Sequence, residues 1–197
     1  RGIWSTDLQP QGTPGNIEIT GTQTLESDEY FFSTENIVIK PGAVYTVKGK
    51  IDMAEGTKII VETEGTLNVN GGTISNKCGE FWSGIEVWGN SNVSQFTQQQ
   101  GRANFYNGAV IEFAEEGVQN WHYNHYNETG GVIQANSTTF RNCKRAAAFY
   151  KYENYSNGQL NVDISDFDNC QFIIDDEFPV NQPHGFVSMW NTYGVRI

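Results

Sequence analysis

Apolar residues alternate with polar residues along the chain from Ile37 onward. The alternating positions are Ile37/Ile39, Ala43/Tyr45/Val47, Ile51/Met53, Ile59/Val61 and Leu67/Val69. A period of two is typical of a β-strand with one buried face, whereas an amphipathic helix repeats every three or four residues. The pattern predicts short strands, and we expect one continuous core formed by Ile59, Val61, Leu67, Val69, Ile111, Phe140 and Phe172.

Short turns separate these strands, at Pro41-Gly42, Glu55-Gly56, Glu64-Gly65 and Gly71-Gly72. The connections are too short for crossover helices. Strands of this kind form either an antiparallel sandwich or a coil of parallel strands.

A diffuse motif favours the coil. An apolar residue, a polar residue and an Asn or small residue recur before a second apolar group, with the first apolar position at Ile74, Ile111, Phe140 and Phe167. A solenoid tolerates such uneven spacing, because loops of any length can leave its turns. In this alignment Asn142 and Asn169 would bond along a ladder of stacked coils, and Cys143 and Cys170 would be buried small apolar groups.

Four segments resemble the β-helix repeats of pectate-lyase-like proteins, in the variety found in large secreted and surface bacterial proteins. They are residues 37–74, 81–90 (FWSGIEVWGN), 108–118 (GAVIEFAEEGV) and 137–149 (STTFRNCKRAAAF). The resemblance covers residues 37–197 and implies an all-β fold, a single-stranded right-handed parallel β-helix. We therefore assign residues 37–197 to β-helix coils, and residues 1–36 to an irregular leading segment with N-terminal strands or a cap.

The net charge excludes some partners. Lys and Arg number 12 against 23 Asp and Glu, for a formal charge of -11, so the average surface repels nucleic acid and anionic lipid. No apolar run approaches the roughly 18 residues that span a bilayer, so we expect no membrane insertion. The three cysteines allow at most one internal disulfide and lack metal-ligand spacing.

The C-terminal third suggests an enzyme. Four segments in this part of the chain resemble, in their order, the N-x-D, D-D, G-H-G and R-I-K motifs of polygalacturonases. They are Asn161-Val162-Asp163, Asp175-Asp176, His184-Gly185 and Arg196-Ile197. This resemblance makes Asp163, Asp175, Asp176 and His184 candidate catalytic residues, with one carboxyl protonating the leaving oxygen and others activating water. The groups are only 8 to 12 residues apart, whereas stacking on successive coils needs about 20 or more.

A polysaccharide lyase would need Ca²⁺ on clustered carboxylates and a basic residue that removes a proton. Asp166, Asp168 and Glu177 are candidate Ca²⁺ ligands beside the three acidic residues above, and Arg141 or Arg145 could be the base. Acidic residues are also common in solvated turns, and the spacing of an EF-hand loop is absent. We therefore expect no obligatory cofactor.

The segment from Trp121 to Glu128 is the most unusual part of the chain. Aromatic rings beside Asn and Glu are suited to sugar recognition, which makes Trp121, Tyr123, Tyr126 and Tyr152 candidate ligand-binding residues. Burial of these rings under their own loops is the alternative. A divalent metal on His122, His125 and Glu128 is a further possibility.

The sequence thus favours a non-catalytic β-helix segment of a large extracellular or cell-surface bacterial protein. It would act as a rigid scaffold or present loops to a glycan or partner, as adhesins do. The alternative is a polysaccharide lyase or polygalacturonase-type glycoside hydrolase. We also expect an open-ended last coil that exposes apolar residues near Ile197, to be covered by the remainder of a larger parent protein.

Overall fold

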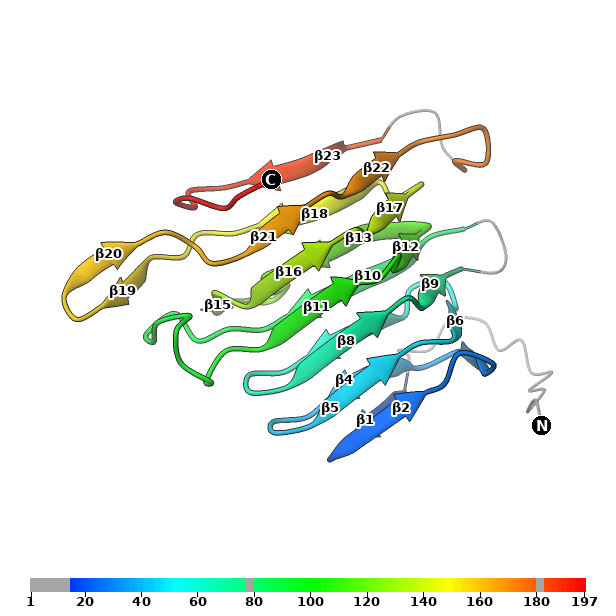
Figure 1. Cartoon of the computed structure of the whole chain (residues 1–197), viewed down its shortest axis with the longest axis horizontal. Helices are drawn as coiled ribbons and strands as arrows, with labels where there is room; N and C mark the ends of the chain where they lie inside the picture. Colours follow the sequence, from blue (N-terminus) through cyan, green and yellow to red (C-terminus); the bar gives the residue numbers. More distant parts are fainter. Residues whose placement is uncertain (1–14, 77–79, 180–182) are drawn as a thin grey trace.

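The structure, a computed structural model, describes residues 15–76, 80–179 and 183–197. Every regular element in these residues is a β-strand, and the long sheets are parallel (Figure 1). None of the described residues belongs to a helix that could cross a bilayer.

Three parallel sheets account for 19 of the 23 strands that these residues form. Sheet A contains β1 (Asn16–Ile19), β4 (Asn36–Ile39), β7 (Lys58–Val61), β10 (Trp82–Val87), β13 (Ala114–Gln119), β18 (Arg145–Phe149) and β23 (Gly185–Met189). Sheet B contains β2 (Thr22–Leu25), β5 (Val44–Val47), β8 (Thr66–Asn70), β11 (Arg102–Tyr106), β16 (Val132–Asn136) and β21 (Asp166–Asp168). Sheet C contains β3 (Tyr30–Ser33), β6 (Lys50–Met53), β9 (Thr73–Ser75), β12 (Val110–Glu112), β17 (Thr139–Arg141) and β22 (Gln171–Ile173).

The chain visits the sheets in the order A, B, C and then returns to A beside the strand it left. We call one such circuit a coil. Aligned residues of adjacent coils are 20 positions apart at Ile17 and Ile37 but 40 apart at Ala148 and Ser188. The extra residues that the structure describes form loops and two hairpins, while the strands keep their register except for a shift between Gly84 and Ile85.

The core lies between the three sheets and follows the predicted alternation. Ile59, Val61, Leu67, Val69, Ile111 and Phe140 are at most 1% exposed, which confirms their placement. Phe172 is partly buried and packs on the Phe140 ring, with 5.6 Å between centroids. The same cluster extends from Ile19 to Phe167, so the core is continuous through the stack.

The expected pairing of Asn142 with Asn169 is wrong. Phe140 aligns with Phe172 instead of Phe167, because the strand that contains Phe167 belongs to sheet B. Asn142 bonds to Asp175 and Asn169 to Ser137. Amide contacts between coils do occur elsewhere, at Asn16–Asn36, Asn68–Asn104 and Asn70–Asn107.

Cys143 is buried, as expected, whereas Cys170 is only partly covered, and both are free thiols. Cys78 lies outside the described residues. The boundary expected at residue 37 falls within β4, and β1 to β3 already pair with the strands of the next coil.

The longest loops leave one corner of the coils, between a sheet A strand and the following sheet B strand. We call it the A–B corner. It includes residues 88–101 and two antiparallel hairpins, β14 (Trp121–His122) with β15 (His125–Thr129) and β19 (Asn154–Ser156) with β20 (Gln159–Asn161). In Figure 1 these loops project on the same side of the molecule.

Candidate functional site

Four aromatic residues occupy equivalent positions at the A–B corner of successive coils. The sheet A register aligns Glu86, Gln119, Ala148 and Ser188. Two residues after these lie Trp88, Trp121, Tyr150 and Trp190. Parallel strands stack about 4.8 Å apart, so the repeat places one large ring on each coil. We call these four residues the aromatic ladder.

Ring contacts run along the last three coils of the ladder. The Tyr150 ring centroid lies 5.8 Å from that of Trp121 and 6.0 Å from that of Trp190. Tyr126, on β15, adds a ring 5.1 Å from Tyr150. Trp190 is 72% exposed and Tyr126 61%, whereas Trp121 and Tyr150 are half-buried. The group therefore presents a broad aromatic surface to solvent.

The hairpin that carries Trp121 is held at its base by Asn120. The backbone oxygen of this buried residue accepts bonds from the backbone N–H groups of Gly130 and Gly131, at 3.1 and 3.2 Å. Its side-chain oxygen accepts the backbone N–H of Tyr150 at 2.8 Å, which joins the hairpin to the next coil. At the tip, Tyr123 is 63% exposed and lies under the ammonium group of Lys58.

Tyr152 does not join this surface. It is only 4% exposed, and its hydroxyl donates a 2.6 Å bond to the backbone oxygen of Val93. Burial raises the pKa of Tyr152 to about 12. This side chain therefore fixes the loop of residues 88–101 and is not available to a ligand.

The hairpin also brings together His122, His125 and Glu128, whose ligand atoms lie within 4.8 Å of one another. His122 packs edge-on against Trp88, with centroids 4.1 Å apart, and close to His125 at 4.3 Å. Burial lowers the pKa of His122, which favours the neutral imidazole. A neutral imidazole is the form that binds metals.

Asp163 lies inside the A–B corner. It is 4% exposed and accepts a 3.0 Å bond from Gln95 Nε2 and a 2.8 Å bond from the Ser165 backbone N–H. Burial raises the pKa of this carboxyl group. Gln95 in turn accepts the backbone N–H of Ile164, so the group holds two long loops together.

Asp175 lies after β22, at the corner where the chain leaves sheet C. Its carboxylate accepts bonds from Arg141 Nε at 2.7 Å and from Asn142 Nδ2 at 2.6 Å. Arg141 also forms ion pairs with Glu112, on β12 of the preceding coil, and with Glu177, in the loop after β22. These ion pairs join three coils and leave the carboxylates occupied by a cation of the chain itself.

Of the other candidate acidic residues, Asp166 and Asp168 lie on the outer face of β21, and Asp176 lies after β22. Asp166 pairs with Arg196, Asp168 accepts a bond from Asn136, and Asp176 is exposed. His184 is exposed at the start of the last sheet A strand. Asp163 and Asp175, which flank β21 and β22, share no bonding partner.

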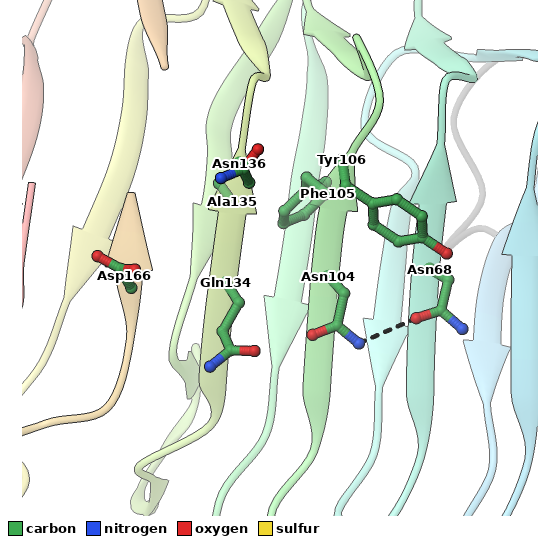
Figure 2. Close-up of a pocket in the computed structure, with 8 residues that line it drawn as sticks. All are labelled: Asn68, Asn104, Phe105, Tyr106, Gln134, Ala135, Asn136 and Asp166. Carbon is green, nitrogen blue, oxygen red and sulfur yellow. Dashed lines mark hydrogen bonds between the residues drawn. The ribbon is translucent and has the colours of Figure 1, made fainter. Parts of the chain in front are cut away.

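A shallow groove of about 470 Å³ lies on the outer face of sheet B (Figure 2). Asn68, Asn104, Gln134 and Asp166 are aligned along it by the strand register. Figure 2 shows Asn104 donating to Asn68, at 2.9 Å, with Tyr106 on the same side. Part of this polar row is therefore used in bonds between coils.

Sequence reasoning identified Trp121 and Tyr126 but missed Trp88 and Trp190 as members of one row. The signal is an aromatic residue one or two positions after a sheet A strand, which occurs four times, in residues 84–88, 117–121, 146–150 and 186–190. Comparison of the chain with protein families, curated proteins and solved structures gives no match.

Proposed function

We propose that the chain is a right-handed parallel β-helix that serves as a rigid, non-catalytic scaffold and binds a glycan through the aromatic ladder and Tyr126. In this proposal it belongs to a larger secreted or cell-surface bacterial protein. The observation that carries the proposal is the row of aromatic rings in register on successive coils.

The sheet topology supports the β-helix. When the four strands of the two hairpins are left out, every third strand along the chain is a neighbour in one of three parallel sheets, which is what a coiling chain produces. Connections between parallel strands of one sheet are right-handed in nearly all proteins. A continuous core with no interruption between coils makes such a scaffold rigid.

The composition of the corner supports glycan binding. Aromatic rings stack on the apolar C–H faces of sugars, and nearby polar groups bond to the hydroxyls. Trp190 and Tyr126 provide exposed rings. Asn124 and Asn127, on the same β14–β15 hairpin as Tyr126, provide exposed polar side chains. A row of rings along the stack suits a linear polymer that lies across several coils.

The positions of the acidic residues do not favour the enzyme alternative. A glycosidase needs two carboxyl groups facing one bond, at most about 10 Å apart. Asp163 is buried between loops of the A–B corner, and Asp175 is bonded to Arg141 on another corner. The bonding partners of the two carboxylates do not include a residue of the aromatic ladder.

Binding to a polysaccharide array, followed by calorimetry with the best ligand, tests the proposal. Tyr126→Ala and Trp190→Ala should each weaken binding by about 1 to 3 kcal/mol, as expected for the loss of an anchor ring. Both side chains are largely exposed, so the variants should keep the wild-type melting temperature.

Tyr30→Ala is the matched control, because Tyr30 is an exposed aromatic residue on sheet C. Binding should be unchanged in that variant. Wild-type affinity in both Tyr126→Ala and Trp190→Ala would rule out this surface. Formation of unsaturated sugar products, with or without Ca²⁺, would contradict the non-catalytic role.

A further inference from the structure

The β14–β15 hairpin places two imidazoles and one carboxylate around a common point. His122 and His125 are cross-strand partners on either side of the two-residue turn. The register shifts between Trp121 and His122, since Trp121 pairs with Thr129. Glu128, next to Thr129 on β15, therefore lies beside both histidines. Glu128 Oε2 lies 3.6 Å from His122 Nδ1, and Oε1 lies 3.7 Å from His125 Nδ1.

Two of these atoms are buried without a hydrogen-bond partner, namely His122 Nδ1 and Glu128 Oε2. Leaving buried polar atoms unpaired is unfavourable. The Trp88 ring covers one side of His122, so the imidazole cannot turn freely toward water. The two atoms lie 3.6 Å apart, and a cation held between them would satisfy both.

From this geometry we propose that His122, His125 and Glu128 bind a divalent transition-metal ion of the Zn²⁺ type. Zn²⁺ binds imidazole nitrogen and carboxylate oxygen at about 2.0 to 2.2 Å, and the edge between two ligands of a tetrahedral ion is then about 3.3 Å. The separations of 3.6 and 3.7 Å are close to that edge. All three ligand atoms lie within 4.8 Å of one another, and the exposed His125 side chain has the freedom to move closer to an ion.

The donor set selects the class of metal. Ca²⁺ and Mg²⁺ prefer oxygen ligands, whereas imidazole suits Zn²⁺ and its first-row neighbours. Three protein ligands leave a fourth position for water or another ligand. The ion would fix the hairpin against Trp88, at the N-terminal end of the aromatic ladder. This inference does not depend on glycan binding.

Isothermal titration of the full chain, free of any histidine tag, with Zn²⁺ tests the proposal. Wild-type protein should bind one ion per chain. Loss of a second-sphere group alone costs metal sites about 10- to 100-fold in affinity, so removing a ligand should cost more than about 100-fold. His125→Ala and Glu128→Gln should both show this loss, and since His125 is largely exposed, its variant should remain folded.

The third histidine provides the matched control. His184 lies outside the hairpin and is exposed, so His184→Ala should bind Zn²⁺ as the wild type does. Zn²⁺ should raise the melting temperature of the wild type and of His184→Ala but not that of His125→Ala. Absence of binding, wild-type affinity in His125→Ala and Glu128→Gln, or loss of binding in His184→Ala would each overturn the site. Equal affinity for Ca²⁺ at these residues would overturn the metal class.

Discussion

Glu116 is a carboxylate that the fold partly removes from water. It lies on β13 opposite Arg145 of the next coil, with Oε1 2.8 Å from the guanidinium nitrogen. Its second oxygen is buried without a hydrogen-bond partner. Burial outweighs the attraction of Arg145 and raises the pKa of Glu116 from 4.5 to about 7.

This shift makes stability depend on pH. The folded state holds the proton of the Glu116 carboxyl group more tightly than the unfolded state does. The stabilisation that comes from this protonation is therefore complete below pH 4.5 and is lost as the pH rises through about 7. As the pH rises from 5 to 7.5, the unfolding free energy of Glu116→Gln should therefore increase relative to that of the wild type by roughly 1 to 3 kcal/mol.

Urea unfolding at several pH values measures this difference. Glu115→Gln is the control, because Glu115 is the exposed neighbour that pairs with Lys144. The same pH-dependent gain in both variants would mean that burial of Glu116 is not its cause.

At the scale of elements, Gly84 determines how β10 packs on β13. Its φ is 108°, and a Cβ atom there would lie 1.6 Å from the backbone oxygen of Glu116. The register between the two strands shifts at this point, since Gly84 pairs with Glu116 and Ile85 with Val118. Only glycine permits this close approach of two backbones.

Gly84→Ala should cost at least about 3 kcal/mol of unfolding free energy, since backbone strain and overlap combine. Gly108→Ala is the comparison, because Gly108 also has a positive φ, of 79°, but nothing lies within 4 Å of its added Cβ. That variant should lose only about 1 to 2 kcal/mol. Similar losses in the two variants, measured by denaturant unfolding, would contradict the role of the close contact.

At the scale of the molecule, each coil contacts chiefly its neighbours. β7 is hydrogen-bonded on both sides, by β4 and β10, whereas β1 and β23 have one neighbouring strand each among the described residues. Apolar side chains are exposed near the last coil, including Phe186 at 47% and Ile197 at 55%. Stability in such a stack depends on the interfaces between neighbours.

Hydrogen exchange should therefore be slowest in the central strands and fastest in the outer ones. We expect the amide protons of β7, β8 and β10 to be protected longest, and those of β1 to β3, β22 and β23 to exchange first. Exchange monitored by mass spectrometry on peptic peptides measures this gradient. Uniform rates over all the strands would show that the stack opens only as a single unit.

The sequence by itself determined the all-β character and the buried face of each strand. The reason is local, because side chains alternate between the two faces whatever the strand pairs with. Ile59, Val61, Leu67 and Val69 were therefore placed correctly from their spacing alone. The aromatic and histidine-rich character of residues 121–128 was also visible.

Only the tertiary structure decided which residues meet between coils. The loops differ in length, so sequence separation does not give the register, and Phe140 aligns with Phe172 where the motif had suggested Phe167. The same cause hid the row formed by Trp88, Trp121, Tyr150 and Trp190. The ion pairs of Asp175 and the burial of Asp163 likewise depend on neighbours more than 30 residues away, which no local pattern specifies.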